Sequence, residues 1–234
     1  SIVVGIKLAH YSGHEWGPTD SAVMAGKLAN LPVMIDFGSA TPPLSIEELF
    51  MKHLRPGDIF THPYACFPDS RETVVDENGK VKPFVFAAQK RGIRFDLGHG
   101  GGSFTWKQAI PSVKQGFITD AISSDLHTGS MNSGMKDMAN LMSKVLNLGL
   151  PLQDVILRST WNPAMMINRP DLGNLDIGSE ADIAVFSMMK GDFGFLDISG
   201  EKLKGTQKLV AELTIRAGKI VWDLNGIAAT GKTW

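Results

Sequence analysis

The segment from residue 92 to residue 127, "GIRFDLGHGGGSFTWKQAIPSVKQGFITDAISSDLH", contains a complete pattern of strand, loop, helix and strand. Ile93–Leu97 is a short apolar run typical of a buried strand, and a glycine-rich loop then leads into an amphipathic stretch over Phe104–Gln115. Gly116 stands where a helix would end, and Phe117–Ser124 is a second apolar run. This order predicts a βα unit whose two strands lie parallel in one sheet.

The same alternation extends toward both ends of this segment. Apolar runs predict further strands at Ile2–Ile6, Leu31–Phe37 and Asp58–His62. Amphipathic stretches predict helices at Thr19–Asn30, Ser45–Leu54, Pro83–Arg91, Asp137–Leu148, Leu152–Ser159 and Thr160–Ile167. Five βα units are more than half of an eight-fold barrel and too few to close one.

The pattern changes after about residue 171. The stretches "LGNLDIGSEADIAVFSM" and "KLVAELTIRAGKIVWDLNG" alternate apolar and polar residues between glycines, which predicts strands of a small β-domain. The segment between them, "KGDFGFLDISGEKLKG", reads as loop and hairpin. We therefore expect a barrel portion over residues 1–170 and a small β-sandwich portion over residues 171–234.

Charge and cysteine content narrow the classes of partner and compartment. The net charge is −1, with 23 basic and 24 acidic residues, so nothing in the charge favours nucleic acid or an anionic membrane surface. No run approaches the roughly 20 apolar residues of a transmembrane helix. Cys66 is the single cysteine, which excludes an intrachain disulfide and fits a reducing compartment such as the cytoplasm. A targeting segment upstream of Ser1 would leave no trace here.

Polar side chains stand where the predicted strands end, and successive strand ends are 26 to 37 residues apart, about one βα unit each, with two of the side chains at the last of them. These residues are Lys7, Asp36, His62, His99, Asp125 and His127. The carboxyl ends of parallel strands share one edge of a sheet, so the side chains should converge there. Imidazole and carboxylate groups together suit Zn²⁺ and similar divalent ions.

Several longer motifs accompany these residues in order along nearly the whole chain. They are "VGIK", "RPGDIFTHPY", "RFDLGHGGGSF", "ISSDLH", "TWNPAMMI" and "GNLDIGSEADIAVF". In this order they resemble the amidohydrolase superfamily, and most closely its deacetylase/dihydroorotase-like branch. The resemblance implies an incomplete (β/α)8 barrel, strands four to eight, followed by part of a β-sandwich.

The resemblance also implies roles for individual residues. Lys7 matches the lysine that is carboxylated by CO₂ and bridges two metal ions, and His62 matches a metal ligand. Asp125 matches the aspartate that contacts metal and shuttles protons. The implied cofactor is one or two divalent ions, with zinc first and manganese or iron as alternatives. The implied reaction is attack of a metal-activated hydroxide on an amide, cyclic amide or ester of a small acylated substrate.

Two features depart from the family pattern. The first-strand His-x-His pair has no counterpart, because the chain starts at what would be the fourth strand; Ser1 therefore does not read as a natural beginning. Asp36 stands where the family commonly has histidine. Aspartate can also bind zinc, so Asp36 remains a candidate ligand beside the alternative of a loop carboxylate at the Gly38 turn.

Each candidate also has an ordinary structural explanation. A strand-terminal lysine such as Lys7 is usually solvated, and an isolated His62 would usually make a structural hydrogen bond. Asp125 could cap a following helix. His99 lies among glycines that allow close backbone approach, so it is either a substrate contact or part of a tight turn, and His127 is a weaker substrate-binding candidate. Three other histidines are expected in surface or loop positions: His10, His14 and His53.

Three functions remain open on these grounds. The first is the metal-dependent hydrolase, the second is a catalytically incomplete or decayed barrel acting as a scaffold, and the third is a small-ligand binder. An exposed barrel seam would favour self-association into a homo-oligomer. The substrate itself is not readable, since the fold does not determine it.

Overall fold

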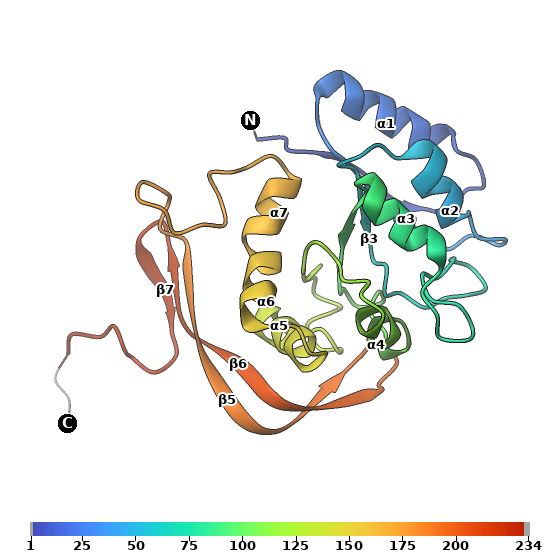
Figure 1. Cartoon of the computed structure of the whole chain (residues 1–234). Coiled ribbons are helices and arrows are strands. Elements are labelled where there is room, and N and C mark those ends of the chain that lie inside the picture. Colours follow the sequence, from blue (N-terminus) through green and yellow to red (C-terminus); the bar gives the residue numbers. More distant parts are fainter. Residues whose placement is uncertain (1, 232–234) are drawn as a thin grey trace.

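A parallel sheet of four strands organises the first half of the protein, seen in a computed structural model that describes residues 2–231 (Figure 1). The strands lie in chain order and are β1 (Ile6–Tyr11), β2 (Val33–Phe37), β3 (Ile59–Thr61) and β4 (Arg94–Asp96). All three neighbouring pairs are parallel, so the four carboxyl ends lie at one edge. Within residues 2–231 this sheet does not close into a barrel.

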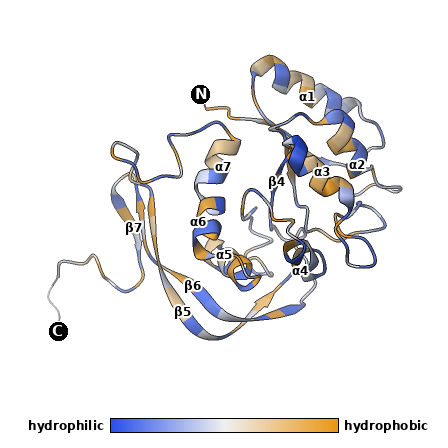
Figure 2. Cartoon of the chain, viewed as in Figure 1, coloured by the Kyte–Doolittle hydropathy of each residue, from blue (hydrophilic) through white to orange (hydrophobic). Residues whose placement is uncertain are grey.

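Helices follow the strands as the alternation predicts. They are α1 (Gly17–Ala29), α2 (Ile46–Glu48), the π-helical turn η1 (Leu49–His53), α3 (Pro83–Arg91), α4 (Trp106–Lys114), α5 (Met138–Asn147), α6 (Leu152–Ser159) and α7 (Trp161–Met166). Figure 2 shows hydrophilic and hydrophobic residues side by side on α1 and α3, as expected for helices with one buried face. Within the described residues, no helix is long and apolar enough to span a membrane.

Local signals place several of these helix boundaries. The Ser45 hydroxyl accepts the Glu48 N–H at 3.2 Å and so caps the helix at the predicted first residue. Gly92 ends α3 with a φ of 96°, a left-handed conformation that favours glycine. The predicted helix Ser45–Leu54 nevertheless changes to a π-turn at Leu49, because the Leu54 N–H bonds to the Leu49 carbonyl.

Two predicted strands differ from the observed structure. Ile2–Ile6 is wrong as a strand: β1 starts at Ile6, where pairing with Val33 begins, and Ile2 is fully exposed. Lys7 therefore lies inside β1 instead of at its end. Phe117–Ser124 runs beside β4 and bonds to it around Ala121, but it forms an isolated bridge there and not a regular strand.

A side chain interrupts the strand ladder at this second site. The Asp120 carboxylate accepts the Phe95 N–H at 2.9 Å, in a position where a strand carbonyl would otherwise serve. On its other side, the Ile122 N–H donates to the Arg158 carbonyl near the end of α6 at 2.7 Å. Both bonds depend on tertiary contacts, so the apolar run alone does not reveal them.

The core of this half is an aromatic cluster between the sheet and its helices. Phe95 lies at its centre, with ring centroids 5.0 Å from Phe117 and 5.3 Å from Phe50, both edge to face. Phe60 adds a further edge-to-face contact with Phe50 at 5.0 Å. All four side chains are almost completely buried, which makes the sheet a rigid support for the loops at its carboxyl edge.

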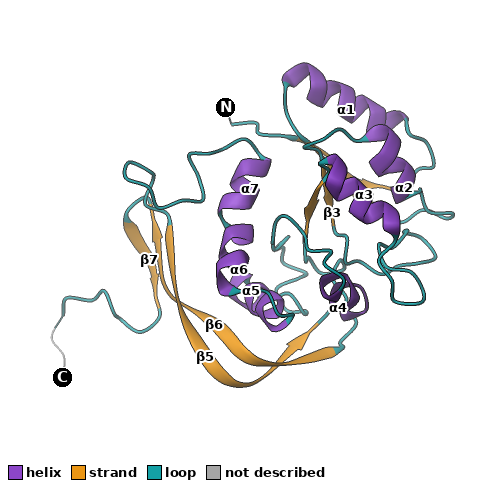
Figure 3. Ribbon diagram, in the orientation of Figure 1, coloured by secondary structure: helices purple, strands orange, loops and turns teal. Residues whose placement is uncertain are grey.

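The last part of the chain is an antiparallel sheet of β5 (Ile183–Leu196), β6 (Lys202–Arg216) and β7 (Lys219–Asp223). Figure 3 shows β5 and β6 as a long curved hairpin that passes beneath α5 and α4. The expectation of loop and hairpin over residues 190–205 is confirmed for the hairpin; the loop is short, because β5 and β6 continue through most of the segment and the chain turns only near Asp197. Whether residues 171–234 form a separate domain stays a prediction.

Asp197 explains why the hairpin turns where it does. Its buried carboxylate accepts the N–H groups of Ser199 at 2.8 Å and Glu201 at 3.0 Å, which closes the turn. It also accepts the Trp106 N–H at 2.9 Å, and the Trp106 indole donates to the Phe195 carbonyl at 3.0 Å. The hairpin is thereby tied to the first turn of α4, next to the carboxyl edge of the parallel sheet.

Candidate functional site

A cavity of about 220 Å³ opens at the carboxyl edge of the parallel sheet. Its lining comes from the ends of successive βα units, as the spacing of polar residues predicts. The lining includes Asp36, His62, Asp125 and His127 from the predicted set, together with His10, Arg71, Ser39, Phe67 and the loop 101–103.

Asp36 is the centre of charge at this edge. Its side chain is 3% exposed, and its Oδ2 atom lies 3.4 Å from Lys7 Nζ and 3.5 Å from His62 Nε2. The Arg71 guanidinium lies 3.8 Å from Oδ1. Burial alone would raise the pKa of Asp36, but the close approach of His62, followed by the charges of Lys7 and Arg71, lowers the pKa below its usual value.

His62 places a ring nitrogen near two carboxylates. Its Nδ1 donates to the Gly98 carbonyl at 2.6 Å, so in the neutral ring Nε2 carries a lone pair. Nε2 faces Asp36 Oδ2 at 3.5 Å and Asp125 Oδ2 at 3.9 Å. Asp36 Oδ2 is buried and has no hydrogen-bond partner, and a histidine fixed through its other nitrogen is typical of metal ligands.

Three of the residues around the cavity have strained backbone angles. His10, His62 and Asp125 all adopt positive φ values, of 52°, 65° and 46°. This region is unfavourable for residues other than glycine, and such strain is held in place by surrounding contacts, often at functional sites. The strain directs all three side chains toward Asp36 or its neighbours.

Two glycines let the loop after β4 approach the site residues. Gly98 has a φ of 51°, and a Cβ there would lie 2.5 Å from His62 Nδ1. Gly100 also has a φ of 51°, and its Cβ would lie 2.5 Å from Asp125 Oδ2. The glycine run therefore allows the backbone of this loop to lie close to the side chains of His62 and Asp125.

Asp96 supports the sheet edge beneath the cavity. Its carboxylate accepts the hydroxyls of Thr61 and Ser123, both at 2.8 Å, and so joins β3, β4 and the 117–124 segment. Burial raises the pKa of Asp96 in spite of these two bonds. His62 follows Thr61 directly, so these bonds also orient the histidine.

His99 does not line the cavity. The ring is completely buried and stacks on Phe104 at 4.5 Å. Its Nδ1 donates to the Gly100 carbonyl at 2.9 Å, and its Nε2 lies 2.7 Å from Lys144 Nζ. Substrate binding by His99 stays a prediction, and these contacts favour a structural role.

Three residues at or near the site were missed by the sequence patterns. His10 was expected in a surface position, yet its exposed ring reaches Asp36 Oδ2 at 3.5 Å because β1 bulges between Ala9 and Tyr11. Arg71 is 9% exposed in a long loop, and Lys144 is completely buried in α5. The positions of Arg71 and Lys144 in the sequence do not indicate that they are buried, because their burial comes from tertiary contacts. His53 pairs with Asp20 at 2.6 Å and stacks on Trp16, outside the site.

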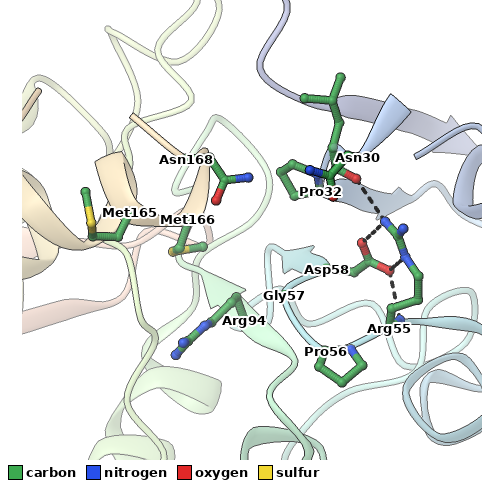
Figure 4. Close-up of a pocket in the computed structure, with 11 residues that line it drawn as sticks. Asn30, Pro32, Arg55, Pro56, Gly57, Asp58, Arg94, Met165, Met166 and Asn168 are labelled. Atoms are coloured by element: carbon green, nitrogen blue, oxygen red, sulfur yellow. Dashed lines mark hydrogen bonds and ion pairs between the residues drawn. The ribbon is translucent and has the colours of Figure 1, made fainter. Parts of the chain in front are cut away.

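A larger cavity of about 360 Å³ lies at the opposite, amino-terminal edge of the sheet (Figure 4). Its charged groups already satisfy one another: Arg55 contacts Asp58 at 2.7 Å, and Asp58 also accepts the Val33 N–H at 2.9 Å. Arg94 pairs with Asp120 at 3.1 Å. The smaller cavity is the better candidate site because its buried carboxylate has no hydrogen-bond partner at one oxygen.

The predicted ligands converge without forming a complete metal site from standard side chains. Across residues 2–231, no group of three or more His, Cys, Asp or Glu side chains is arranged to hold a metal ion. The fourth neighbour of the cluster is Lys7, whose ammonium pairs with Asp36. A lysine can join such a site only after it loses its positive charge.

Comparison with known proteins gives consistent results. Residues 100–221 match the amidohydrolase family. A deacetylase from Brucella anthropi is 33% identical over 203 residues, which cover 85% of this chain and 49% of the deacetylase. The chain spans about half the length of the curated relatives it matches.

Two solved structures are similar to the fold. An adenine deaminase gives a TM-score of 0.85 at 26% identity, and a dihydroorotase gives 0.79 at 27% identity. Each alignment covers 94% of this chain and 60% of the other. These likenesses confirm the partial (β/α)8 barrel with a separate antiparallel sheet.

Proposed function

Because the chain belongs to the amidohydrolase family, in its deacetylase/dihydroorotase-like branch, we propose that it carries part of the active site of a metal-dependent hydrolase. The bond cleaved would be an amide, cyclic amide or ester of a small acylated substrate. The observation that carries this proposal is the position of His62 Nε2, which lies 3.5 Å from the Asp36 carboxylate and 3.9 Å from that of Asp125 while Nδ1 is bonded to the Gly98 carbonyl. Three acceptor groups pointing at one another favour a bound cation.

The residues suited to hold that cation are His62, Asp125, Asp36 and a carboxylated Lys7. Lys7 Nζ lies 3.4 Å from Asp36, and its side chain is 42% exposed, so CO₂ can reach it. Carboxylation would replace the ammonium by an anionic carbamate. A divalent ion, when bound, supplies the acidity that makes water a nucleophile at a pH near ~7. Zinc is the first expectation, with manganese or iron as alternatives.

The chain's own side chains account for substrate positioning and proton transfer. Asp125 is half exposed at the mouth of the cavity, where its carboxylate can pass a proton to the leaving group. His127 lines the same cavity, and its Nδ1 accepts the Gly129 N–H at 3.2 Å, so Nε2 is the nitrogen that can donate to a substrate. Phe67 gives the cavity an apolar wall.

A non-catalytic small-ligand binder or scaffold is the second candidate. It is favoured by the absence, among residues 2–231, of a complete group of three standard metal-binding side chains. It is also favoured by the Lys7–Asp36 ion pair, which neutralises the central carboxylate without a metal. The same cavity would then bind a small molecule without cleaving it.

Metal analysis of the purified protein separates these candidates. The variants Lys7→Ala, His62→Ala and Asp125→Ala should each lose metal, whereas His14→Ala, which changes an exposed loop histidine, should keep it. Unchanged metal content in all three variants would overturn the proposed site. A panel of N-acetylated, O-acetylated and cyclic amide compounds then tests hydrolysis, for which Asp125→Asn should lower kcat by about 10²–10⁴-fold.

A further inference from the structure

Lys144 is a completely buried lysine that lies outside the cavity and has no part in the reaction proposed above. It extends from α5, and its Nζ lies 2.7 Å from His99 Nε2. It also donates to the carbonyls of Gly134 and Leu196, both at 2.6 Å. The three partners belong to the loop after β4, to the loop that follows Asp125, and to the end of β5.

The three partners match an ammonium at Lys144. Both carbonyls can only accept, and His99 uses Nδ1 to donate to the Gly100 carbonyl, which leaves a lone pair on Nε2. Three acceptors therefore take the three protons of one –NH₃⁺ group. The rings of Phe104 at 5.3 Å and Trp106 at 5.9 Å add cation–π attraction.

The first loop held by this ammonium lies directly against Asp125. His99 and Gly100 donate their N–H groups to the carbonyls of Ser123 at 3.1 Å and Ser124 at 2.9 Å. Gly100 is so close to the Asp125 carboxylate that a Cβ would lie 2.5 Å from Oδ2. Movement of His99 would therefore move the backbone that confines Asp125.

The second loop carries His127. The Ser130 hydroxyl accepts the His127 N–H at 3.0 Å, and the Ser133 hydroxyl donates to the Ser130 carbonyl at 2.8 Å. Gly134 follows directly and receives the Lys144 bond. Hydrogen bonds within this short turn, together with the peptide bond from Ser133 to Gly134, thus connect His127 with the buried ammonium.

The geometry points to Lys144 as a positioning residue, whose ammonium holds the 98–103 and 126–137 loops so that Asp125 and His127 face the cavity. This inference rests on the proposed function, in which those two side chains act on the substrate. Lys144 itself touches neither the cavity nor the reacting groups. Nothing in its sequence context, "LMSKVL", distinguishes it from a surface lysine of an amphipathic helix.

The charges around Lys144 make this arrangement sensitive to pH. Burial lowers the pKa of Lys144 to about 7; Asp197 opposes this shift, and Lys136 adds to it. Loss of the proton removes one of the three donors. The unfolded chain has the higher pKa, 10.5, so between these values it binds more protons and this group makes global stability rise with pH. As pH rises above about 7, the two loops should therefore loosen even though the contribution of Lys144 to global stability increases.

Hydrogen exchange of backbone amides, measured by mass spectrometry, tests the inference without any assay of activity. Lys144→Met keeps the length of the side chain and removes all three donors, so exchange in both loops should rise by about tenfold or more after correction for intrinsic rates. The control is Ser143→Ala on the same helix, which removes buried bonds to Ala139 and Leu209 but none to the loops. If Lys144→Met does not fold, hydrogen exchange of the wild-type protein over a range of pH tests the inference instead. Protection of the two loops should fall as pH rises above about 7, and protection of α3 should stay the same.

Kinetics separate positioning from general stability. Lys144→Met should lower kcat by roughly 10–100-fold with little change in KM, because a misplaced Asp125 slows proton transfer more than binding. Lys144→Arg keeps its charge at alkaline pH and should flatten the alkaline decline of kcat/KM. Unchanged loop exchange in Lys144→Met would overturn the inference. If Lys144→Met raises loop exchange as predicted but the wild-type protein binds no metal and hydrolyses no substrate, the inference about Lys144 stands and only the proposed function is overturned.

Discussion

Replacing Gly100 by alanine tests whether the glycine loop confines Asp125 as the structure indicates. Gly100 has a φ of 51°, and a Cβ at this position would lie 2.5 Å from Asp125 Oδ2. Gly102, two residues further along the same loop, has no atom within 4 Å of its Cβ position. Gly100→Ala and Gly102→Ala therefore make the same chemical change at a crowded and at an open site.

The expected loss of stability is modest. A left-handed conformation costs a residue with a Cβ roughly 1–2 kcal/mol. The clash itself is with the end of a half-exposed side chain, which can rotate away at little further cost. We therefore expect Gly100→Ala to lower the free energy of unfolding by about 1–2 kcal/mol, and Gly102→Ala to change it by less than about 1 kcal/mol.

The expected loss of activity is much larger, because rotation takes the Asp125 carboxylate out of its position. A displacement of about 1 Å in a reacting group can cost on the order of 10²-fold in rate. The assay compares urea unfolding, metal content and kcat for both variants and the wild type. If Gly100→Ala loses stability but keeps the kcat of Gly102→Ala, the placement of Asp125 by this loop is wrong.

Three further predictions concern two buried aromatic rings and the cap of a helix. Burial and the nearby Lys144 lower the pKa of His99 to about 3, below its unfolded value of 6.5, so its stabilising contribution is present above pH 6.5 and lost toward pH 3. Urea unfolding at a series of pH values should show a slope of about 1.4 kcal/mol per pH unit in that window that His99→Phe lacks; equal slopes would contradict this account. Phe95→Ala should cost about 3–5 kcal/mol by chemical denaturation, because it removes the ring at the centre of the aromatic cluster; a loss below about 1 kcal/mol would not fit a packed core. Ser45→Ala should cost about 1 kcal/mol by losing the N-cap bond to Glu48, and Ser45→Asp, which retains an acceptor, should recover most of it.

Local sequence patterns predict the bounds of a helix or strand well where those bounds depend on residues nearby in the chain. Pro83–Arg91 and Leu152–Ser159 are observed with the predicted bounds, because a proline, a cap or a left-handed glycine acts within a few residues. Phe117–Ser124 was predicted less well because its backbone partners, Asp120 and the Arg158 carbonyl, arise only after the chain folds. Strand pairing involves residues far apart in the chain. An apolar run therefore indicates a tendency to form a strand but does not identify the segment it pairs with.

The order of βα units and the family follow from the sequence alone, which also predicts that Asp36, His62 and Asp125 meet at one edge. The reason is geometrical: parallel strands bring their carboxyl ends together whatever their loops contain. Three features come from the folded arrangement instead: His10 turns toward Asp36, His99 is buried away from the cavity, and Lys144 lies in the interior. These outcomes depend on burial and on strained backbone angles, which are set by contacts between segments far apart in the chain.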